Sequence, residues 1–559
     1  MPTRLFHPTS FTGDYKVIPV ILLAWCVLFI GGLVGHQGSR WVYVVFSVVL
    51  TAVLLSGLYR PKSYGYLFLA IFFWLGFWLK LSVHNIFQYD YVEPVGRFDS
   101  SPAAWDEALW VATVAGMGLL VGRWLYGAWR GKHHLVLTAD SARVPLWYPA
   151  HRRMVWMLLM GSIAVLAALN SIYGIQQSGL TPRTILVWPL NGLIYWLLST
   201  GFSMALATIL WWDICLKKDI SLPVYAVFVE AFLSTMSLLS RGIFLFHLLP
   251  AFTGLALNQA QIQWRARASL LRTACIVGLL FVISISVVST ARSYLYQQGQ
   301  DFRTTTLKRL IRFEVLEGKI PAVEEMILKN EPLEKQLPDI KSHGLRKDLP
   351  LPPQLEKLKE ERAALAVAIR DERARTDGTL GTSMGQFKLV VSEFAYQMTG
   401  GFVDRVSALA VDRWIGIEGV MATVGHPSKS MDLFITALLE RSAGDQASRY
   451  QVISNSGYGD ADASKYRFAT LPGATAFFYF SGALWWVFLG MTMLSVAMFI
   501  AEHLARRLTG NALLCALVGM NAANAVAQLG VVPRQLLIHF GMIAIAVIGI
   551  SLVQPRGRT

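Results

Sequence analysis

Apolar and polar residues follow one another along the chain in long blocks. Each apolar block is close to the roughly 17 to 25 residues that cross a bilayer as a helix. Twelve such blocks lie at 17–35, 41–58, 64–83, 106–127, 154–173, 187–212, 221–239, 243–259, 270–290, 474–501, 511–529 and 534–553. About 180 mostly polar residues separate the ninth from the tenth. This pattern predicts an all-α polytopic membrane protein with about 12 transmembrane helices and one large, mainly helical loop between spans 9 and 10.

The same pattern predicts three regions. Residues 1–291 would form a transmembrane bundle of spans 1–9, residues 292–472 the loop domain, and residues 473–559 spans 10–12. Within the loop, 303–375 has the composition of two polar helices that form an arm, whereas 384–440 is apolar enough to face the membrane. The first apolar block lacks a small-residue cleavage pattern, so we expect it to be retained as a span.

The positions of the charged residues along the chain give information on its topology. The chain is 54% hydrophobic, too apolar for a soluble protein of 559 residues, and carries a formal charge of +15. Residues 293–470 hold 24 basic and 24 acidic side chains, so the whole excess lies outside the loop. Most of these other basic residues fall at alternating block ends, among them Arg60, Lys62, Arg130, Lys132, Lys217, Lys218, Arg506 and Arg507. This positive-inside pattern predicts cytoplasmic termini and an outward-facing loop, and gives no support for nucleic-acid binding.

Ionisable residues inside the apolar blocks are few. Glu230 lies in the middle of the seventh block, where an acidic group is either functional or paired with a polar group of the bundle, for example Asn170 or Asn191. His247 and His539 are expected to be satisfied core residues. The four cysteines all lie in or beside apolar blocks: Cys26, Cys215, Cys275 and Cys515. They indicate neither a disulfide framework nor a metal site, and we expect no metal and no cofactor.

Three pieces of sequence together resemble a known family. They are Leu239-Ser-Arg-Gly-Ile243 at the outer end of a span, 404–419 late in the loop, and 471–482 entering the tenth span. They are similar to the Wzy-type O-antigen and exopolysaccharide repeat-unit polymerases, which have many spans, a large periplasmic loop and outward arginines. Arg405 and Gly416 match an Arg-x10-Gly pattern of that family, whereas Ile194 stands at the corresponding position after Arg183. The resemblance covers the architecture of the whole chain and about 40 residues of motif.

The resemblance implies a polymerase of oligosaccharide units carried on undecaprenyl pyrophosphate, in a bacterial inner (plasma) membrane. The reducing-end sugar of a growing chain would move onto a hydroxyl of a new unit and release the lipid pyrophosphate. Pyrophosphate needs fixed positive charge, which arginine supplies through its planar fork. The candidate pyrophosphate-binding residues are Arg241, Arg413, Arg405, Arg292 and Arg183. The acceptor hydroxyl needs a general base, for which Glu418 is the first candidate and Asp412 and His426 are alternatives.

Other functions fit the same pattern. An O-antigen ligase, or another lipid-carrier-dependent glycosyltransferase, would share the outward site and the lipid donor but use a different acceptor. A transporter or flippase for polysaccharide precursors is the non-enzymatic alternative, although the unequal halves of the chain do not favour it. The partners implied by the resemblance are the lipid-linked glycan, the bilayer, a chain-length regulator and a flippase, without nucleic acid.

Overall fold

The computed structural model describes the chain in segments. They are residues 17–59, 61–88, 91, 93–130, 143–180, 182–187, 189–258, 275–291, 356, 359, 360, 363, 364, 411, 414–440, 448–454, 471–529 and 533–555. Apart from isolated positions, the expected arm at 303–375 and the segment from 384 to 413 lie outside these residues. The second of the two compact units of the chain, which begins at Ser289, therefore lies almost wholly outside them as well.

The described residues form helices and contain no β-strand. The helices before the loop are α1 (Val17–Val34), α2 (Arg40–Leu58), α3 (Tyr64–Phe73), η1 (Trp74–Leu79), α4 (Lys80–Phe87), α5 (Pro102–Arg130), α6 (Tyr148–Tyr173), α7 (Leu190–Trp196), η3 (Leu197–Gly201), α8 (Phe202–Cys215), α9 (Ser221–Leu238), α10 (Arg241–Leu257) and Cys275–Ala291. Those after it are α17 (Ile417–Val424), α18 (Met431–Leu438), α19 (Arg449–Ile453), α20 (Gly473–Tyr479), α21 (Leu484–Thr509), α22 (Ala512–Ala527) and α23 (Pro533–Val553). The elements η1 and η3 are π-helical turns inside longer helices.

Eight of the described helices are long and apolar enough to cross a membrane, as expected of a polytopic membrane protein. Four shorter apolar helices coincide with the first, eighth, ninth and eleventh predicted spans: Pro19–Val34, Arg241–Leu257, Cys275–Ala291 and Ala512–Ala527. The total of twelve spans therefore stays a prediction. The single span expected at 474–501 was wrong, because a turn at 480–483 divides it into α20 and α21. Gly482 has a φ of +72° in this turn, a conformation that ends the first helix.

The helices pack around two hydrophobic cores. One core is formed by α1 to α5 with α17 and α20 to α23, and the other by α6 to α10 with the helix Cys275–Ala291. The short helix α22 joins them, since Leu513 belongs to the second core and Leu514 to the first. The outer faces of α1, α6 and α23 expose large apolar side chains such as Ile21, Leu158 and Leu537. Apolar faces of this kind are the ones that lipid covers in a membrane.

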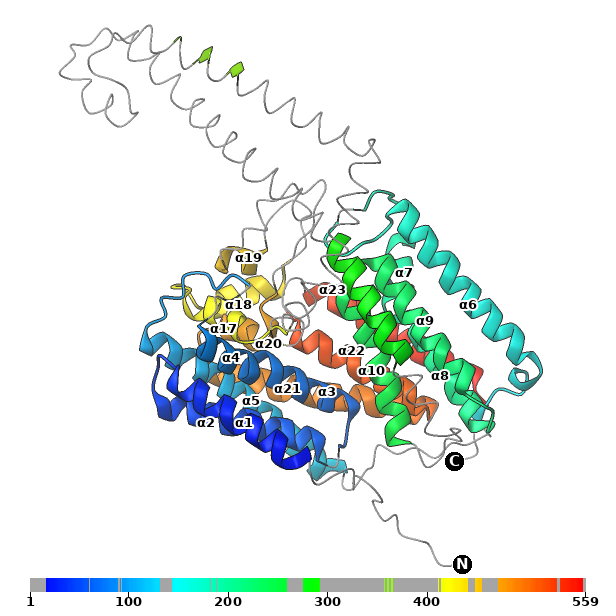
Figure 1. Cartoon of the computed structure of the whole chain (residues 1–559), viewed down its shortest axis with the longest axis horizontal. Helices are drawn as coiled ribbons and strands as arrows, with labels where there is room; N and C mark the ends of the chain where they lie inside the picture. Colours follow the sequence, from blue (N-terminus) through cyan, green and yellow to red (C-terminus); the bar gives the residue numbers. More distant parts are fainter. Residues whose placement is uncertain are drawn as a thin grey trace, which may run out of the picture. The chain divides into compact units, whose positions relative to one another are not determined.

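A small helical layer covers one end of the first core. We call residues 414–440, 448–454 and 471–482 the cap. Figure 1 shows its helices, α17 to α20, together at the end of the bundle where α4 lies. The cap has an aromatic core of its own, with Phe434, Tyr450, Phe477 and Phe480 buried in it. It belongs to the same compact unit as the apolar helices, so the end of the loop is packed on the bundle.

Candidate functional site

A buried ion pair joins the cap to the bundle. The Nζ atom of Lys80, the first residue of α4, lies 2.5 Å from Oε1 of Glu418 and donates a second hydrogen bond of 2.6 Å to the carbonyl oxygen of Trp414. The two side chains are only 1% and 3% exposed. Glu418 lies in the first turn of α17, where the helix dipole also favours a negative charge. The first candidate base is therefore neutralised by a lysine of the third span.

Two glycines explain how the backbone at 415–416 can lie directly against the third predicted span. Gly76 lies in the π-helical turn η1, and a Cβ atom there would come 2.5 Å from the carbonyl oxygen of Ile415. A Cβ atom on Gly416 would in turn overlap the carbonyl group of Gly76. The indole of Trp414 stacks on Phe72, one turn before Gly76, with ring centroids 4.8 Å apart. Non-helical backbone is tolerated beside a spanning helix only where protein encloses it, and this segment meets that condition.

His426 lies just beyond the other end of α17 and is half-buried. Its backbone N–H bonds to the carbonyl oxygen of Thr423, 3.1 Å away. The preceding residue, Gly425, lies so close to the backbone of Arg97 and Phe98 that a side chain would not fit between them. Burial lowers the pKa of His426, and the positive charges of Arg97 and Lys429 lower it further. A neutral imidazole beside two cations can accept a proton in a site that also binds an anion.

Lys429 fixes the end of this turn. Its Nζ atom lies 3.0 Å from Oε1 of Glu107, at the start of α5, and donates to the carbonyl oxygen of Val424 at 2.8 Å. The hydroxyl of Tyr479 donates to the same Glu107 oxygen at 2.6 Å. Arg97, by contrast, has an exposed side chain. Of the two cations beside His426, Arg97 is therefore the more available to a ligand.

Of the other predicted site residues, the structure describes Arg241 and Arg183. Arg241 is the first residue of α10 and is half-buried. Its helix contacts α3 through Phe246, whose ring lies 6.2 Å from that of Phe72, the residue that stacks on Trp414 of the cap. Arg183 is exposed in the connection from α6 to α7, which packs on the second core, and its N–H bonds to the carbonyl oxygen of Gly174. Four predicted residues lie outside the described part of the chain: Asp412, Arg413, Arg405 and Arg292.

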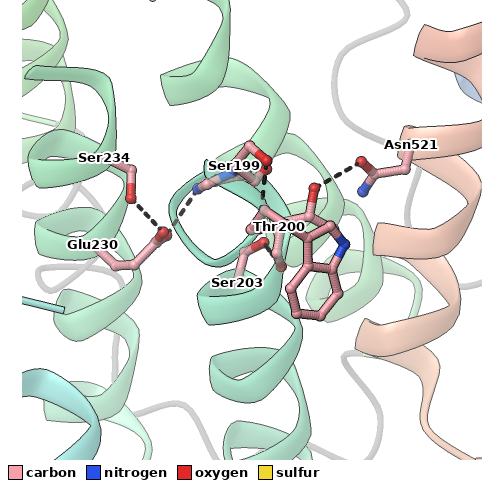
Figure 2. Close-up of polar contacts among 8 residues, drawn as sticks. Ser199, Thr200, Ser203, Glu230, Ser234 and Asn521 are labelled. Carbon is pink, nitrogen blue, oxygen red and sulfur yellow. Dashed lines mark hydrogen bonds and ion pairs between the residues drawn. The ribbon is translucent and has the colours of Figure 1, made fainter. Parts of the chain in front are cut away.

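A second buried polar group lies in the other core. Oε2 of Glu230 is 3.0 Å from Nδ1 of His247, and Oε1 accepts from the hydroxyl of Ser234 at 2.8 Å. Nε2 of His247 lies 2.9 Å from the carbonyl oxygen of Ser199, in the π-helical turn η3. Figure 2 shows Glu230 and Ser234 on one helix facing this turn, where Thr200 bonds to Asn521 of α22.

Glu230 is thus paired with polar groups of the bundle, but not with either asparagine named as an example. Asn170 bonds instead to Ser237 and to the backbone of Gln176, while Asn191 holds the turn before α7. Both amides are used in local loop structure and so are not partners of Glu230. The expectation that His247 is a satisfied core residue is confirmed, because it is 3% exposed and both its ring nitrogens are bonded.

Sequence reasoning missed Lys80, Arg97 and Lys429. A signal existed for Lys80, because a lysine inside an apolar segment is itself a reason to expect a functional or paired group. Arg97 and Lys429 are ordinary loop residues in the sequence; Lys429 follows His426 by three residues, whereas only the fold brings Arg97 to it. Comparison of the chain with protein-family models, with curated proteins and with solved structures found no match.

Proposed function

We propose that this protein is a polymerase that joins lipid-linked oligosaccharide repeat units into a surface polysaccharide. The observation that carries the proposal is the cluster just after the C-terminal end of α17. There a half-buried imidazole with a lowered pKa lies beside Arg97 and Lys429, on a cap packed against apolar helices. A base and cations at the end of a membrane bundle suit a substrate with a sugar hydroxyl and a lipid pyrophosphate.

In the proposed reaction His426 is the general base. The acceptor hydroxyl oxygen forms a bond to the anomeric carbon of the donor while the bond from that carbon to the phosphate oxygen breaks. The proton passes to the imidazole, and the electron pair leaves with the pyrophosphate. General bases of this kind typically contribute about 10²- to 10⁴-fold in rate.

The leaving pyrophosphate gains negative charge as the bond breaks and needs cations close by. Arg97 meets this need beside His426, with Lys429 more strongly occupied by Glu107. Arg241 is the further candidate, because the N-terminus of α10 adds a positive helix dipole at the end of a predicted span.

The proposal includes a topology and a location. The twelve apolar helices cross a bacterial inner membrane, both termini are cytoplasmic, and the cap and the loop face the periplasm. The basic residues at alternating helix ends support this orientation. The lipid-linked donor then enters from the bilayer, and a flippase supplies it while a chain-length regulator limits the product.

The test measures lipid-linked glycans by mass in membranes of a deletion strain that expresses the wild type, His426→Asn or Arg241→Ala. We expect single repeat units to accumulate in both variants while the wild type converts them to polymer. His151→Asn and Arg153→Ala, two exposed positions on α6, are the matched controls and should make normal polymer.

The same measurement separates the alternatives. Finished polymer that is not attached to its final acceptor would identify a ligase instead of a polymerase. Units held on the cytoplasmic side would identify a transporter. Normal polymer in both variants, at wild-type expression, would exclude His426 and Arg241 from the site.

A further inference from the structure

Lys80 has no direct part in the proposed chemistry, yet it is one of the most enclosed charged groups described. Its side chain is 1% exposed, and its Nζ atom faces Glu418 and the carbonyl oxygen of Trp414. A group this enclosed cannot touch a substrate without rearrangement of the bundle. Burying an ammonium group is costly, so the contacts that compensate for its burial must hold it in place.

The hydrogen bonds described for Lys80, together with two neighbouring contacts, end on one short segment. Lys80 holds the backbone at Trp414 and the side chain of Glu418, Phe72 stacks on the indole of Trp414, and Gly76 admits the backbone of 415–416. Three kinds of contact therefore fix the N-terminal end of α17 against the third span.

α17 carries this constraint to His426. The helix has eight residues, from Ile417 to Val424, and the N–H of His426 bonds back to Thr423 in its last turn. The far side of the turn is held by the ion pair of Lys429 with Glu107. His426 thus lies between two ionic anchors, one inside the bundle and one at its end.

We propose that Lys80 is a positioning residue, which through Glu418 and α17 places the His426 imidazole beside Arg97 and Lys429. The role in catalysis rests on the proposed function, but the placement of His426 does not. Loss of the anchor allows α17 to shift on the bundle and His426 to move away from the two cations. A displacement of about 1 Å in an active site can lower a rate by about 100-fold.

The experiment uses the full-length protein with both charges removed, Lys80→Met/Glu418→Gln, because either single change leaves an unpaired buried charge that can prevent folding. The reactivity of His426 with diethyl pyrocarbonate is followed against pH by peptide mass. Only the neutral imidazole reacts, so the pH at which reactivity is half-maximal, the His426 midpoint, reports the environment of this side chain. It needs no assumption about activity.

In the wild type we expect a midpoint below the ordinary histidine value of about 6.5. In the double variant it should rise toward that value, and kcat for chain extension should fall by about 100-fold with little change in KM. The matched control is Arg152→Met/Asp213→Asn, which removes an ion pair of 2.7 Å between a partly exposed arginine and a buried aspartate beside the second core and should leave the His426 midpoint unchanged.

An unchanged midpoint and rate in a folded double variant would overturn the proposal and leave Lys80 a purely structural residue. If the wild type extends no lipid-linked unit, the proposed function fails, whereas the shift of the His426 midpoint still decides the placement. A shift of equal size in the control pair would also count against Lys80, because it would show a general loosening of the bundle.

Discussion

At the scale of single residues, the protonation of His426 decides whether the proposed site works at neutral pH. Its pKa is lowered first by burial and then by Arg97 and Lys429, and each of these effects favours the neutral imidazole. Removing either cation should raise the pKa. We therefore expect Arg97→Ala and Lys429→Met to move the acidic limb of the pH–rate profile to higher pH, and Arg40→Ala, an exposed residue of α2, to leave it unchanged.

The lowered pKa of His426 also makes the folded state less stable as the pH falls. The unfolded chain binds a proton on this histidine at about pH 6.5, whereas the folded chain resists protonation until a lower pH. The unfolded state thus holds more protons as pH falls through that window, and the folded state loses stability there. His426→Asn should remove this part of the acid sensitivity, which thermal unfolding in detergent at pH 7 and pH 5 measures. An identical pH dependence of stability in the variant would mean that the pKa of His426 is not lowered in the folded protein.

At the scale of elements, the Glu230–His247 pair holds the π-helical turn η3 in place through the contact of His247 with the Ser199 carbonyl oxygen. Nε2 of His247 faces the Ser199 carbonyl oxygen, which can only accept a hydrogen bond, and Nδ1 faces Oε2 of Glu230. A proton must therefore lie between Nδ1 and Oε2, since two facing lone pairs in a buried site would repel each other.

This geometry predicts a contrast between single and double substitutions. His247→Leu leaves the Glu230 carboxylate buried, with Ser234 as its one remaining partner among the described residues, and should cost about 3–5 kcal/mol of unfolding free energy. Glu230→Leu/His247→Leu removes both groups and should lie closer to the wild type. Equal stability of the single variant and the wild type in denaturant unfolding would contradict the pair. A stable double variant that makes no polymer would instead assign the pair to function.

The elements themselves were largely predictable, because an apolar block of spanning length has few alternatives to a helix. Most of the described helices begin and end within about four residues of the predicted blocks, as at Ser221–Leu238 against 221–239, whereas α6 begins earlier and α21 is displaced toward the C-terminus. The turn that separates α20 from α21 was missed, because apolar residues continue through it and hydrophobicity does not report backbone breaks. The π-helical turns have no simple sequence signal, although Gly76 and Gly201 lie in them.

At the scale of the whole molecule, the candidate site depends on contacts between residues far apart in the chain. Lys80 and Glu418 are separated by 338 positions, and Lys429 and Glu107 by 322. No periodic pattern or motif of the sequence connects residues so far apart. The sequence could therefore identify Glu418 and His426 as candidates, but it could not show that Lys80 pairs with Glu418 or that Glu107 pairs with Lys429. The same contacts explain why the cap belongs to the bundle even though most of its residues come from the polar loop.

The orientation of the whole molecule can be tested independently of its chemistry. The distribution of basic residues predicts that the cap is outside and the connection between α8 and α9 inside. With Cys26, Cys215, Cys275 and Cys515 replaced by serine, a single cysteine is introduced at Ser428 in the cap or at Lys218 in that connection, two exposed positions. An impermeant maleimide should label Ser428→Cys in intact cells, with outer membranes made permeable where present, and Lys218→Cys only after lysis. The reverse result would put the cap in the cytoplasm, away from any periplasmic lipid-linked unit, and the proposed polymerase could not operate there.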